Sequence, residues 1–204
     1  FVQEQQLGTG DAVKAALPAI AGHAGDVIVL YADTPLTTVD NIARLRASLD
    51  GGNQVAVLGF EPDDPTGYGR LLTDASGALT AIREDKDASD AERKVRLCNS
   101  GVLGFRVADL AGVLGRLTNA NAKGEYYLTD TIELICADGG RAGVVTCAAE
   151  DVLGVNSRDQ LAEAEAIWQR RRRMEAMREG ATLIAPETVW FSHDTVIGRD
   201  VLVE

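Results

Sequence analysis

The run Val-Ile-Val-Leu-Tyr-Ala-Asp at residues 27–33 restricts the possible folds more than any other part of the chain. Five apolar residues in a row, mostly β-branched, predict a strand covered on both faces, which is the pattern of a parallel sheet. Asp33 falls where this strand ends, just before Pro35. Ligands of open α/β sheets bind beyond the carboxyl ends of the strands, so Asp33 is a candidate ligand of a hard cation such as Mg²⁺. A cap on the helix predicted to begin near Thr38 accounts for Asp33 equally well.

The chain continues as an alternation of predicted strands and helices. Helices are predicted over residues 10–21, 39–48, 108–117 and 129–137, and strands over residues 27–31, 54–60, 70–73, 79–83 and 100–106. The strand–helix–strand order indicates right-handed crossovers in a doubly wound α/β sheet. Turn residues at 74–77 join two of the strands as a hairpin.

A second landmark is the long helix predicted from Ser157 to about residue 179. Ser157 and Gln160 form a capping box, and Gly180 marks the C-terminal end. A helix of about 22 residues spans roughly 33 Å, which is long enough to connect two domains. Four arginines at 170–173 favour a solvated face near the helix C-terminus over nucleic-acid binding. One predicted face carries the apolar residues Leu161, Ala164, Ile167, Trp168, Met174 and Met177.

The residue pattern changes after Gly180. Short β runs follow, and Val196-Ile-Gly198 with Val201 is typical of one coil of a hexapeptide β-helix. A single coil cannot bury its own face, so we expect a second domain to begin here and to continue past residue 204.

Composition and charge exclude several classes of function. Hydrophobic content of 46% and charged content of 25% are ordinary for a soluble globular protein. A net charge of −11 argues against nucleic acid or an anionic membrane as partner. No apolar run approaches the roughly 18 residues of a membrane span. Three cysteines without C-x-x-C spacing favour a reducing, cytoplasmic compartment, and the isolated His23 and His193 are expected at the surface.

Several polar clusters are open to two interpretations. The Gly8-Thr9-Gly10 segment before a helix is either a plain turn or a phosphate- or base-binding amide cluster. Residues 64–70 form a tight turn or a ligand-facing loop, and the charges at 84–87 form a solvated turn or part of a site. Thr129 is either a helix cap or part of a sugar-binding edge. The carboxamide of Asn156 could complete the coordination of a metal held by Asp33.

Seven motifs in a fixed order resemble the GlmU family, the bacterial bifunctional N-acetylglucosamine-1-phosphate uridylyltransferases and glucosamine-1-phosphate N-acetyltransferases. They are Gln-x-x-Gln-Leu-Gly-Thr-Gly at 3–10, Tyr-Ala-Asp-Thr-Pro-Leu at 31–36, Asp-Pro-Thr-Gly-Tyr-Gly-Arg at 64–70, Glu-Asp-Lys-Asp at 84–87, Asn-Ser-Gly at 99–101, Gly-Glu-Tyr-Tyr-Leu-Thr-Asp at 124–130 and Gly-Val-Asn at 154–156. The resemblance covers nearly the whole chain.

The resemblance implies a Rossmann-like, GT-A-like nucleotidyltransferase fold with a mixed sheet, a long linker helix and the first coil of a left-handed parallel β-helix. It implies three segments: a uridylyltransferase domain over 1–156, the linker helix over 157–180 and the start of the acetyltransferase domain over 181–204. It also implies a cytoplasmic enzyme, homotrimeric at full length, that feeds peptidoglycan and lipopolysaccharide synthesis.

The implied reaction transfers UMP from UTP to N-acetylglucosamine-1-phosphate and yields UDP-N-acetylglucosamine and pyrophosphate. By resemblance, Asp33 and Asn156 are the catalytic pair that holds Mg²⁺. The uracil base would contact Gln3, Gly8 and Thr9. The sugar pocket would be lined by Tyr31, Gly69, Glu84, Asn99, Tyr127 and Thr129.

The chain departs from the family pattern in two respects. Ala32 replaces the usual glycine before the aspartate. The family's first strand and its Leu-Ala-Ala-Gly-x-Gly-Thr-Arg-Met phosphate loop, with a following lysine, do not occur in the sequence. We therefore expect an N-terminal piece to be missing and the 204-residue chain to make no product by itself. Acetyl-CoA would bind only through the part of the β-helix beyond its first coil.

Two other classes of function fit part of this sequence. One is a hexapeptide-repeat acyltransferase whose N-terminal domain only regulates, and the other is a non-catalytic assembly module. Neither requires the Asp33 and Asn156 pair or intact sugar-pocket motifs, so the sequence favours the uridylyltransferase.

Overall fold

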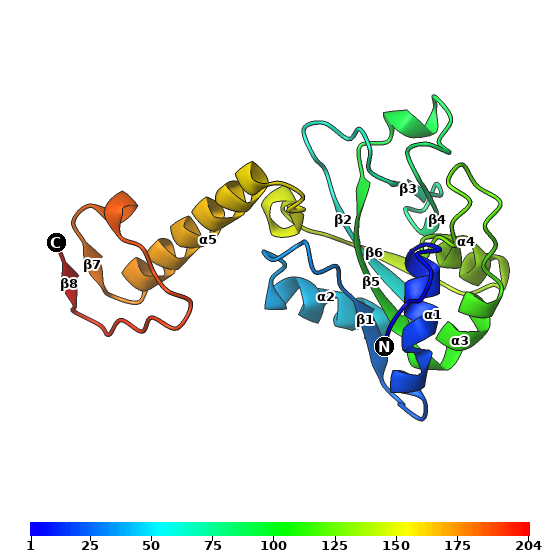
Figure 1. Cartoon of the computed structure of the whole chain (residues 1–204), viewed down its shortest axis with the longest axis horizontal. Helices are drawn as coiled ribbons and strands as arrows, with labels where there is room; N and C mark the ends of the chain where they lie inside the picture. Colours follow the sequence, from blue (N-terminus) through cyan, green and yellow to red (C-terminus); the bar gives the residue numbers. More distant parts are fainter. The chain divides into compact units, whose positions relative to one another are not determined.

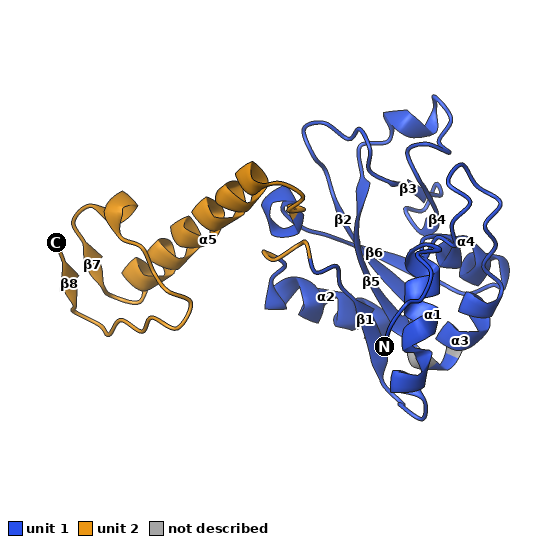
Figure 2. Cartoon of the chain, viewed as in Figure 1, with its two compact units in different colours: residues 1–32, 37–152 blue, residues 33–36, 153–204 orange. Residues whose placement is uncertain are grey.

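The computed structural model describes residues 1–204, apart from the side chains of Val107 and Asp109. The chain divides into two compact units, coloured separately in Figure 2. Unit 1 comprises Phe1–Ala32 and Thr37–Val152, and unit 2 comprises Asp33–Leu36 and Leu153–Glu204. The short Asp33–Leu36 segment therefore belongs with the C-terminal part of the chain and not with its neighbours in sequence.

Unit 1 is built on a six-stranded mixed sheet in the order β1-β5-β2-β6-β4-β3 (Figure 1). Strands β2 and β6 pair in parallel, and the other neighbours in this order pair antiparallel. A mixed sheet is what the resemblance implied. The strands are β1 (Asp26–Val29), β2 (Val55–Phe60), β3 (Arg70–Thr73), β4 (Leu79–Arg83), β5 (Cys98–Arg106) and β6 (Ala142–Thr146).

Helices cover both faces of this sheet, because successive residues of a strand point to opposite sides. Val55 and Val57 of β2 pack in one apolar cluster with residues of α1, α3 and α4. Ala56 and Leu58 pack in a second cluster with Leu45 and other residues of α2. The helices are α1 (Thr9–Ile20), α2 (Val39–Asp50), α3 (Val107–Gly115) and α4 (Asp130–Ala137), with short 3-10 turns at η1 (Glu92–Lys94) and η2 (Ala149–Val152).

The prediction that the strand at 27–31 lies in a parallel pairing, covered on both faces, is wrong. Strand β1 is the edge strand of the sheet, pairs antiparallel with β5, and all four of its residues are partly exposed. An apolar, β-branched run favours a strand but fixes neither the position of that strand in the sheet nor the direction of its neighbour, which explains the error. The predicted crossover is present, since β1 and β2 both run antiparallel to β5 and α2 connects them.

Strand β6 lies in the interior of the sheet but is absent from the sequence-based prediction. Its residues are Ala-Gly-Val-Val-Thr, of which only two are fully buried. A five-residue strand that contains glycine gives a weak periodic signal. Its place is set by parallel pairing with β2, a long-range contact.

Unit 2 is organised around the long helix α5 (Arg158–Arg178), followed by β7 (Thr182–Leu183), η3 (Pro186–Thr188) and β8 (Leu202–Val203). Ser157 caps α5 as predicted, and Gly180 follows the helix with a φ of 109°. Strands β7 and β8 pair in parallel. Ala164 and Ile167 of the predicted apolar face are buried, whereas Leu161 is 56% exposed.

The arginine run of α5 is solvated only in part, because Arg170 is exposed whereas Arg171, Arg172 and Arg173 are half-buried. Arg172 donates a hydrogen bond to the carbonyl of Thr195 at 3.1 Å, and its guanidinium lies 5.6 Å from the centre of the Phe191 ring. Arg173 donates to the carbonyl of Val189 at 3.1 Å. Arg172 and Arg173 therefore attach the chain after Gly180 to the helix.

The remaining surface predictions concern histidines, cysteines and membrane segments. His23 and His193 are exposed, as expected, and the three cysteines are free thiols. Within the described part of the chain, no helix is both long enough and apolar enough to cross a membrane.

Candidate functional site

Four of the predicted sugar-pocket residues are brought together at one end of the sheet in unit 1. The carbonyl of Gly69 accepts a hydrogen bond from the backbone N–H of Asn99 at 2.8 Å. A Cβ atom on Gly69 would lie 3.5 Å from both carboxylate oxygens of Glu84. Thr129 Oγ1 donates to Glu84 Oε1 at 3.0 Å. The starts of β3, β5 and α4 and the end of β4 thus meet near the Glu84 carboxylate, which accepts the hydrogen bond from Thr129.

These contacts overturn two structural interpretations of the sequence. Thr129 occupies the N-cap position of α4, but its side chain makes no capping hydrogen bond and is directed to Glu84 instead. The acidic segment 84–87 is not a solvated turn, because Asp85 pairs with the guanidinium of Arg70 at 3.2 Å. The Arg70 side chain is only 2% exposed and also donates to the carbonyl of Tyr68. Arg70 therefore links the turn before Gly69 to the residue after Glu84.

Tyr31, also predicted to line the sugar pocket, packs against Gly101, two residues after Asn99. Gly101 has a φ of 88°, and a Cβ there would lie 2.3 Å from Cε2 of the Tyr31 ring. The N–H of Gly101 donates to Oδ1 of Asn99 at 3.0 Å. A glycine at 101 is thus required both by its backbone conformation and by the close approach of the tyrosine.

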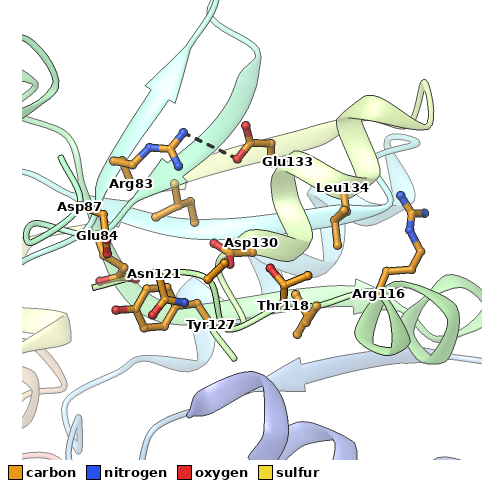
Figure 3. Close-up of a pocket in the computed structure, with 13 residues that line it drawn as sticks. Arg83, Glu84, Asp87, Arg116, Thr118, Asn121, Tyr127, Asp130, Glu133 and Leu134 are labelled. Carbon is orange, nitrogen blue, oxygen red and sulfur yellow. Dashed lines mark ion pairs between the residues drawn. The ribbon is translucent and has the colours of Figure 1, made fainter. Parts of the chain in front are cut away.

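A cavity of about 280 Å³ adjoins Glu84 and Tyr127 (Figure 3). Its polar lining also includes Asp87, Asp130 and Arg83, and Arg83 pairs with Glu133 at 3.7 Å. Tyr127 is 7% exposed, and its hydroxyl, like Asp87 Oδ2, has no hydrogen-bond partner among the described residues. Unpaired buried polar atoms are costly, and they identify this region as one where a polar ligand or ordered water is needed.

Burial, together with the charges around the cavity, raises the pKa values of two groups. Burial, reinforced by Asp87 and Glu84, raises the pKa of the Tyr127 hydroxyl to about 12. Burial, reinforced by Glu133, raises the pKa of Asp130 to about 6. Tyr127 therefore remains a neutral hydrogen-bond donor at physiological pH, beside several carboxylates.

The residues predicted to contact the base lie at the start of α1, against the segment that contains Tyr127. Gln3 Nε2 donates to the carbonyl of Gly8 at 3.1 Å and to Asp11 Oδ2 at 2.8 Å. Thr9 Oγ1 accepts from the N–H of Leu128 at 3.0 Å. Gly8 has a φ of 111°, and a Cβ there would lie 2.7 Å from the carbonyl oxygen of Tyr126. The three residues are thus assembled as one structured turn.

The predicted metal ligands Asp33 and Asn156 both belong to unit 2. The N–H of Val155 donates to the carbonyl of Asp33 at 2.8 Å, which brings the two segments together. The alternative that Asp33 caps the following helix is wrong, because Thr38 is the N-cap of α2 and accepts from the N–H of Asn41. Within the described residues, the exposed side chains of Asp33 and Asn156 make no hydrogen bond.

The donor atoms of this pair fit a hard divalent cation. A carboxylate oxygen and a carboxamide oxygen are ligands that Mg²⁺ accepts, and two protein ligands leave positions for phosphate oxygens and water. The described residues contain no group of three or more His, Cys, Asp or Glu side chains arranged to hold a metal. Because it supplies two ligands, the pair suits a metal that is shared with a phosphorylated substrate.

Three residues of this region were not singled out from the sequence as site residues. Asp87 and Asp130 lie inside motifs that the sequence presented, but only the cavity shows that they face it. Gln160 was assigned to the helix cap, and its side chain reaches the main chain of Asn156.

Unit 1 has a Rossmann-like α/β fold with a mixed sheet. The chain is similar to a nucleoside-diphosphate-sugar pyrophosphorylase from Vibrio cholerae RC9, with a TM-score of 0.58 and 16% identity over 80% of this chain and 66% of that one. At this identity the likeness concerns the fold alone. No family model matches the chain.

Sequence relatives identify the family. The chain is 58% identical over 204 residues to the bifunctional protein GlmU of Xanthobacter autotrophicus and equally to that of Azorhizobium caulinodans. It is 57% identical over 198 residues to the GlmU of Maricaulis maris. The matches cover 100%, 100% and 97% of this chain but only 45%, 45% and 44% of the relatives. The chain belongs to the GlmU family and spans less than half the length of these relatives.

Proposed function

We propose that the chain carries the uridylyltransferase part of a GlmU enzyme, which transfers UMP from UTP to N-acetylglucosamine-1-phosphate. The products would be UDP-N-acetylglucosamine and pyrophosphate. The observation that carries this proposal is the hydrogen bond from the Thr129 hydroxyl to the carboxylate of Glu84, which lies beside Gly69 and the backbone of Asn99 that is bonded to it. A carboxylate held by neighbouring hydroxyl and backbone groups is suited to accept hydrogen bonds from sugar hydroxyls.

The proposed reaction is a displacement at phosphorus. An oxygen of the sugar phosphate forms a bond to the α-phosphorus of UTP, and the bond from that phosphorus to the bridging oxygen of the β-phosphate breaks. Pyrophosphate leaves with the electron pair. Such a step requires positioning and charge neutralisation more than covalent chemistry from the protein.

Separate sets of residues would bind the sugar, the uracil base and the metal at the phosphates. Glu84 and Asn99 would take the hydroxyls and the N-acetyl group, with Tyr31, Gly69, Tyr127 and Thr129 as further lining. Gln3, Gly8 and Thr9 would contact the uracil. This family class implies a divalent metal, and we propose Mg²⁺, held by Asp33 and Asn156. When bound, the metal would neutralise the charge of the phosphates.

The segments follow the family's architecture in this proposal. Residues 1–156 belong to the uridylyltransferase domain, 157–180 to the linker helix and 181–204 to the start of a left-handed β-helix. The parallel pairing of β7 with β8 supports the beginning of such a coil. Acetyl-CoA would be used only by the remainder of the β-helix, in a cytoplasmic homotrimer without nucleic-acid or membrane partners.

A pyrophosphate-release assay on the full-length protein tests the proposal. With UTP and Mg²⁺, N-acetylglucosamine-1-phosphate should support turnover, and UDP-N-acetylglucosamine should appear in equal amount. Glucose-1-phosphate, which lacks the N-acetyl group, should react at least about tenfold less efficiently, because contacts to that group are lost. Absence of turnover with N-acetylglucosamine-1-phosphate in a folded protein would contradict the proposed function.

A further inference from the structure

We propose that Gln160 is a positioning residue for the metal ligand Asn156. In the usual capping box, the side chain three residues after the cap accepts from the N–H of the capping residue itself. Here Ser157 accepts from the N–H of Gln160 at 3.4 Å, but Gln160 Oε1 accepts from the N–H of Asn156 at 2.7 Å. The reciprocal bond is thus shifted by one residue, onto the residue that supplies the ligand.

The loop that carries Asn156 is fixed from two directions within unit 2. The N–H of Val155 donates to the carbonyl of Asp33 at 2.8 Å, and the next N–H, of Asn156, donates to Gln160. The segment with Asp33 is in turn held on α5. Leu36 packs with Ala164 and Ile167 of that helix, and its carbonyl accepts from Arg171 Nη1 at 3.4 Å. Both proposed ligands are therefore placed relative to the same helix, and Gln160 supplies the contact to Asn156.

Fixing the main chain of Asn156 matters because, among the described residues, its side chain has no hydrogen bond of its own to hold it in place. The side chain is also exposed. Mg²⁺ requires near-ideal octahedral geometry at about 2.0–2.1 Å, so a displaced carboxamide oxygen is a poor ligand. Partners that orient a metal ligand typically change metal affinity by about 10- to 100-fold when removed.

The inference rests on the proposed function, since it requires Asn156 to be a metal ligand. The test uses the full-length protein with Mn²⁺ as the probe, bound in the presence of UDP-N-acetylglucosamine and followed by electron paramagnetic resonance. Gln160→Ala should weaken Mn²⁺ binding about tenfold. Gln160→Glu keeps an acceptor oxygen at the same place and should bind within about twofold of the unchanged protein.

Ser157→Ala is the matched control for helix stability. It removes the cap hydrogen bond of the same helix but leaves the bond from Asn156 to Gln160 in place. It should lower the thermal midpoint at least as much as Gln160→Ala does, with Mn²⁺ affinity unchanged. Weakening of Mn²⁺ binding by Ser157→Ala to the same extent as by Gln160→Ala would overturn the positioning role, because helix stability alone would then explain both.

Asn156→Ala separates failure of this inference from failure of the proposed function. If Asn156→Ala leaves Mn²⁺ affinity unchanged, the metal assignment itself is wrong. If Asn156→Ala weakens binding while Gln160→Ala does not, the metal assignment stands and the positioning role is wrong. Weaker Mn²⁺ binding in Asn156→Ala and in Gln160→Ala, with nearly unchanged binding in Gln160→Glu, supports both the metal assignment and the positioning role.

Discussion

The carboxylate of Glu84 accepts a hydrogen bond from the hydroxyl of Thr129 at 3.0 Å, and it lies beside Gly69, where a Cβ would come within 3.5 Å of both carboxylate oxygens. The Glu84 carboxylate is only partly buried, so the oxygen lone pairs that Thr129 does not use can accept hydrogen bonds from a ligand. The next residue, Asp85, is occupied by the buried guanidinium of Arg70 and is not free to compete for that ligand. Asp85 is therefore engaged in an ion pair within the protein, whereas the neighbouring Glu84 is available to a ligand.

We predict that Thr129→Val raises the KM for the sugar phosphate about tenfold and changes the KM for UTP little. The variant removes a hydrogen bond to a charged group, which is worth about 1.5–3 kcal/mol. Steady-state kinetics with each substrate varied in turn measures this.

Thr131→Val is the matched control, because Thr131 is fully buried and donates to the carbonyl of Leu128. It should reduce thermal stability and leave the KM for the sugar phosphate unchanged. An equal rise in KM in both variants would show that the effect is general loosening of α4.

We predict that Asp130→Asn stabilises the protein at pH 7 and that the gain disappears toward pH 4. The pKa of Asp130 is raised to about 6 from 3.8 by burial and by Glu133. The folded state therefore favours the protonated form, and the stability it contributes is present below pH 3.8 and is lost as pH rises toward 6. Because the group is only partly buried, screening limits the gain to roughly 1 kcal/mol, or about 3 °C.

Thermal melts between pH 4 and pH 7 measure whether the stabilisation by Asp130→Asn grows as the pH rises. Asp138→Asn is the control, since a hydrogen bond from Arg116 lowers the pKa of that exposed carboxyl. It should show no gain at pH 7. A stabilisation by Asp130→Asn that is equal at both pH values would contradict the explanation by titration.

Residue types and motif order were enough to select Glu84, Asn99 and Thr129 as candidates. They could not show what each side chain does, because Thr129 at a helix start is predicted to cap and instead donates to Glu84. Whether Thr129 caps α4 or donates to Glu84 depends on a contact between residues distant in sequence. The same holds for Asp33, whose alternative as a cap was excluded only when Thr38 was seen to cap the helix.

At the level of elements, α5 is the part of the chain that local sequence determines best. Its cap, its length and its glycine stop were all predicted, since each depends on nearby residues. Strands β1 and β6 show the opposite case. Their positions depend on pairing with β5 and β2, which lies outside any local pattern.

Gln169 of α5 provides a buried polar contact between the helix and the following segment. Its side chain is 1% exposed, donates to the carbonyl of Phe191 at 2.8 Å and accepts from the N–H of Phe191 at 2.8 Å. We predict that Gln169→Leu destabilises the segment after Gly180 by about 2–4 kcal/mol, because two buried backbone groups lose their partners. Hydrogen exchange should show faster exchange over residues 181–203, with the sheet of unit 1 unchanged.

Met174→Ala serves as the control on the same helix, since Met174 is 41% exposed. It should leave exchange of residues 181–203 nearly unchanged. Equal loss of protection in the two variants would contradict the specific role of Gln169.

At the scale of the whole molecule, the candidate residues fall into two sets. The sugar and base residues lie in unit 1, and Asp33 and Asn156 lie together in unit 2 with the helix that precedes the predicted β-helix. Each set is ordered by contacts inside its own unit. Membership of the GlmU family supports the use of both sets in one reaction, and a direct experiment can test this.

The most direct test is Asp33→Ala in the full-length protein, with uridylyl transfer and acetyl transfer measured on the same preparation. Loss of a metal ligand removes several kcal/mol of charge stabilisation, so uridylyl transfer should fall by about 10³-fold or more. Acetyl transfer from acetyl-CoA to glucosamine-1-phosphate should remain near its original rate. Unchanged uridylyl transfer, or loss of both activities in a variant that still folds, would contradict the assignment of Asp33 to a separate metal-dependent uridylyl-transfer site.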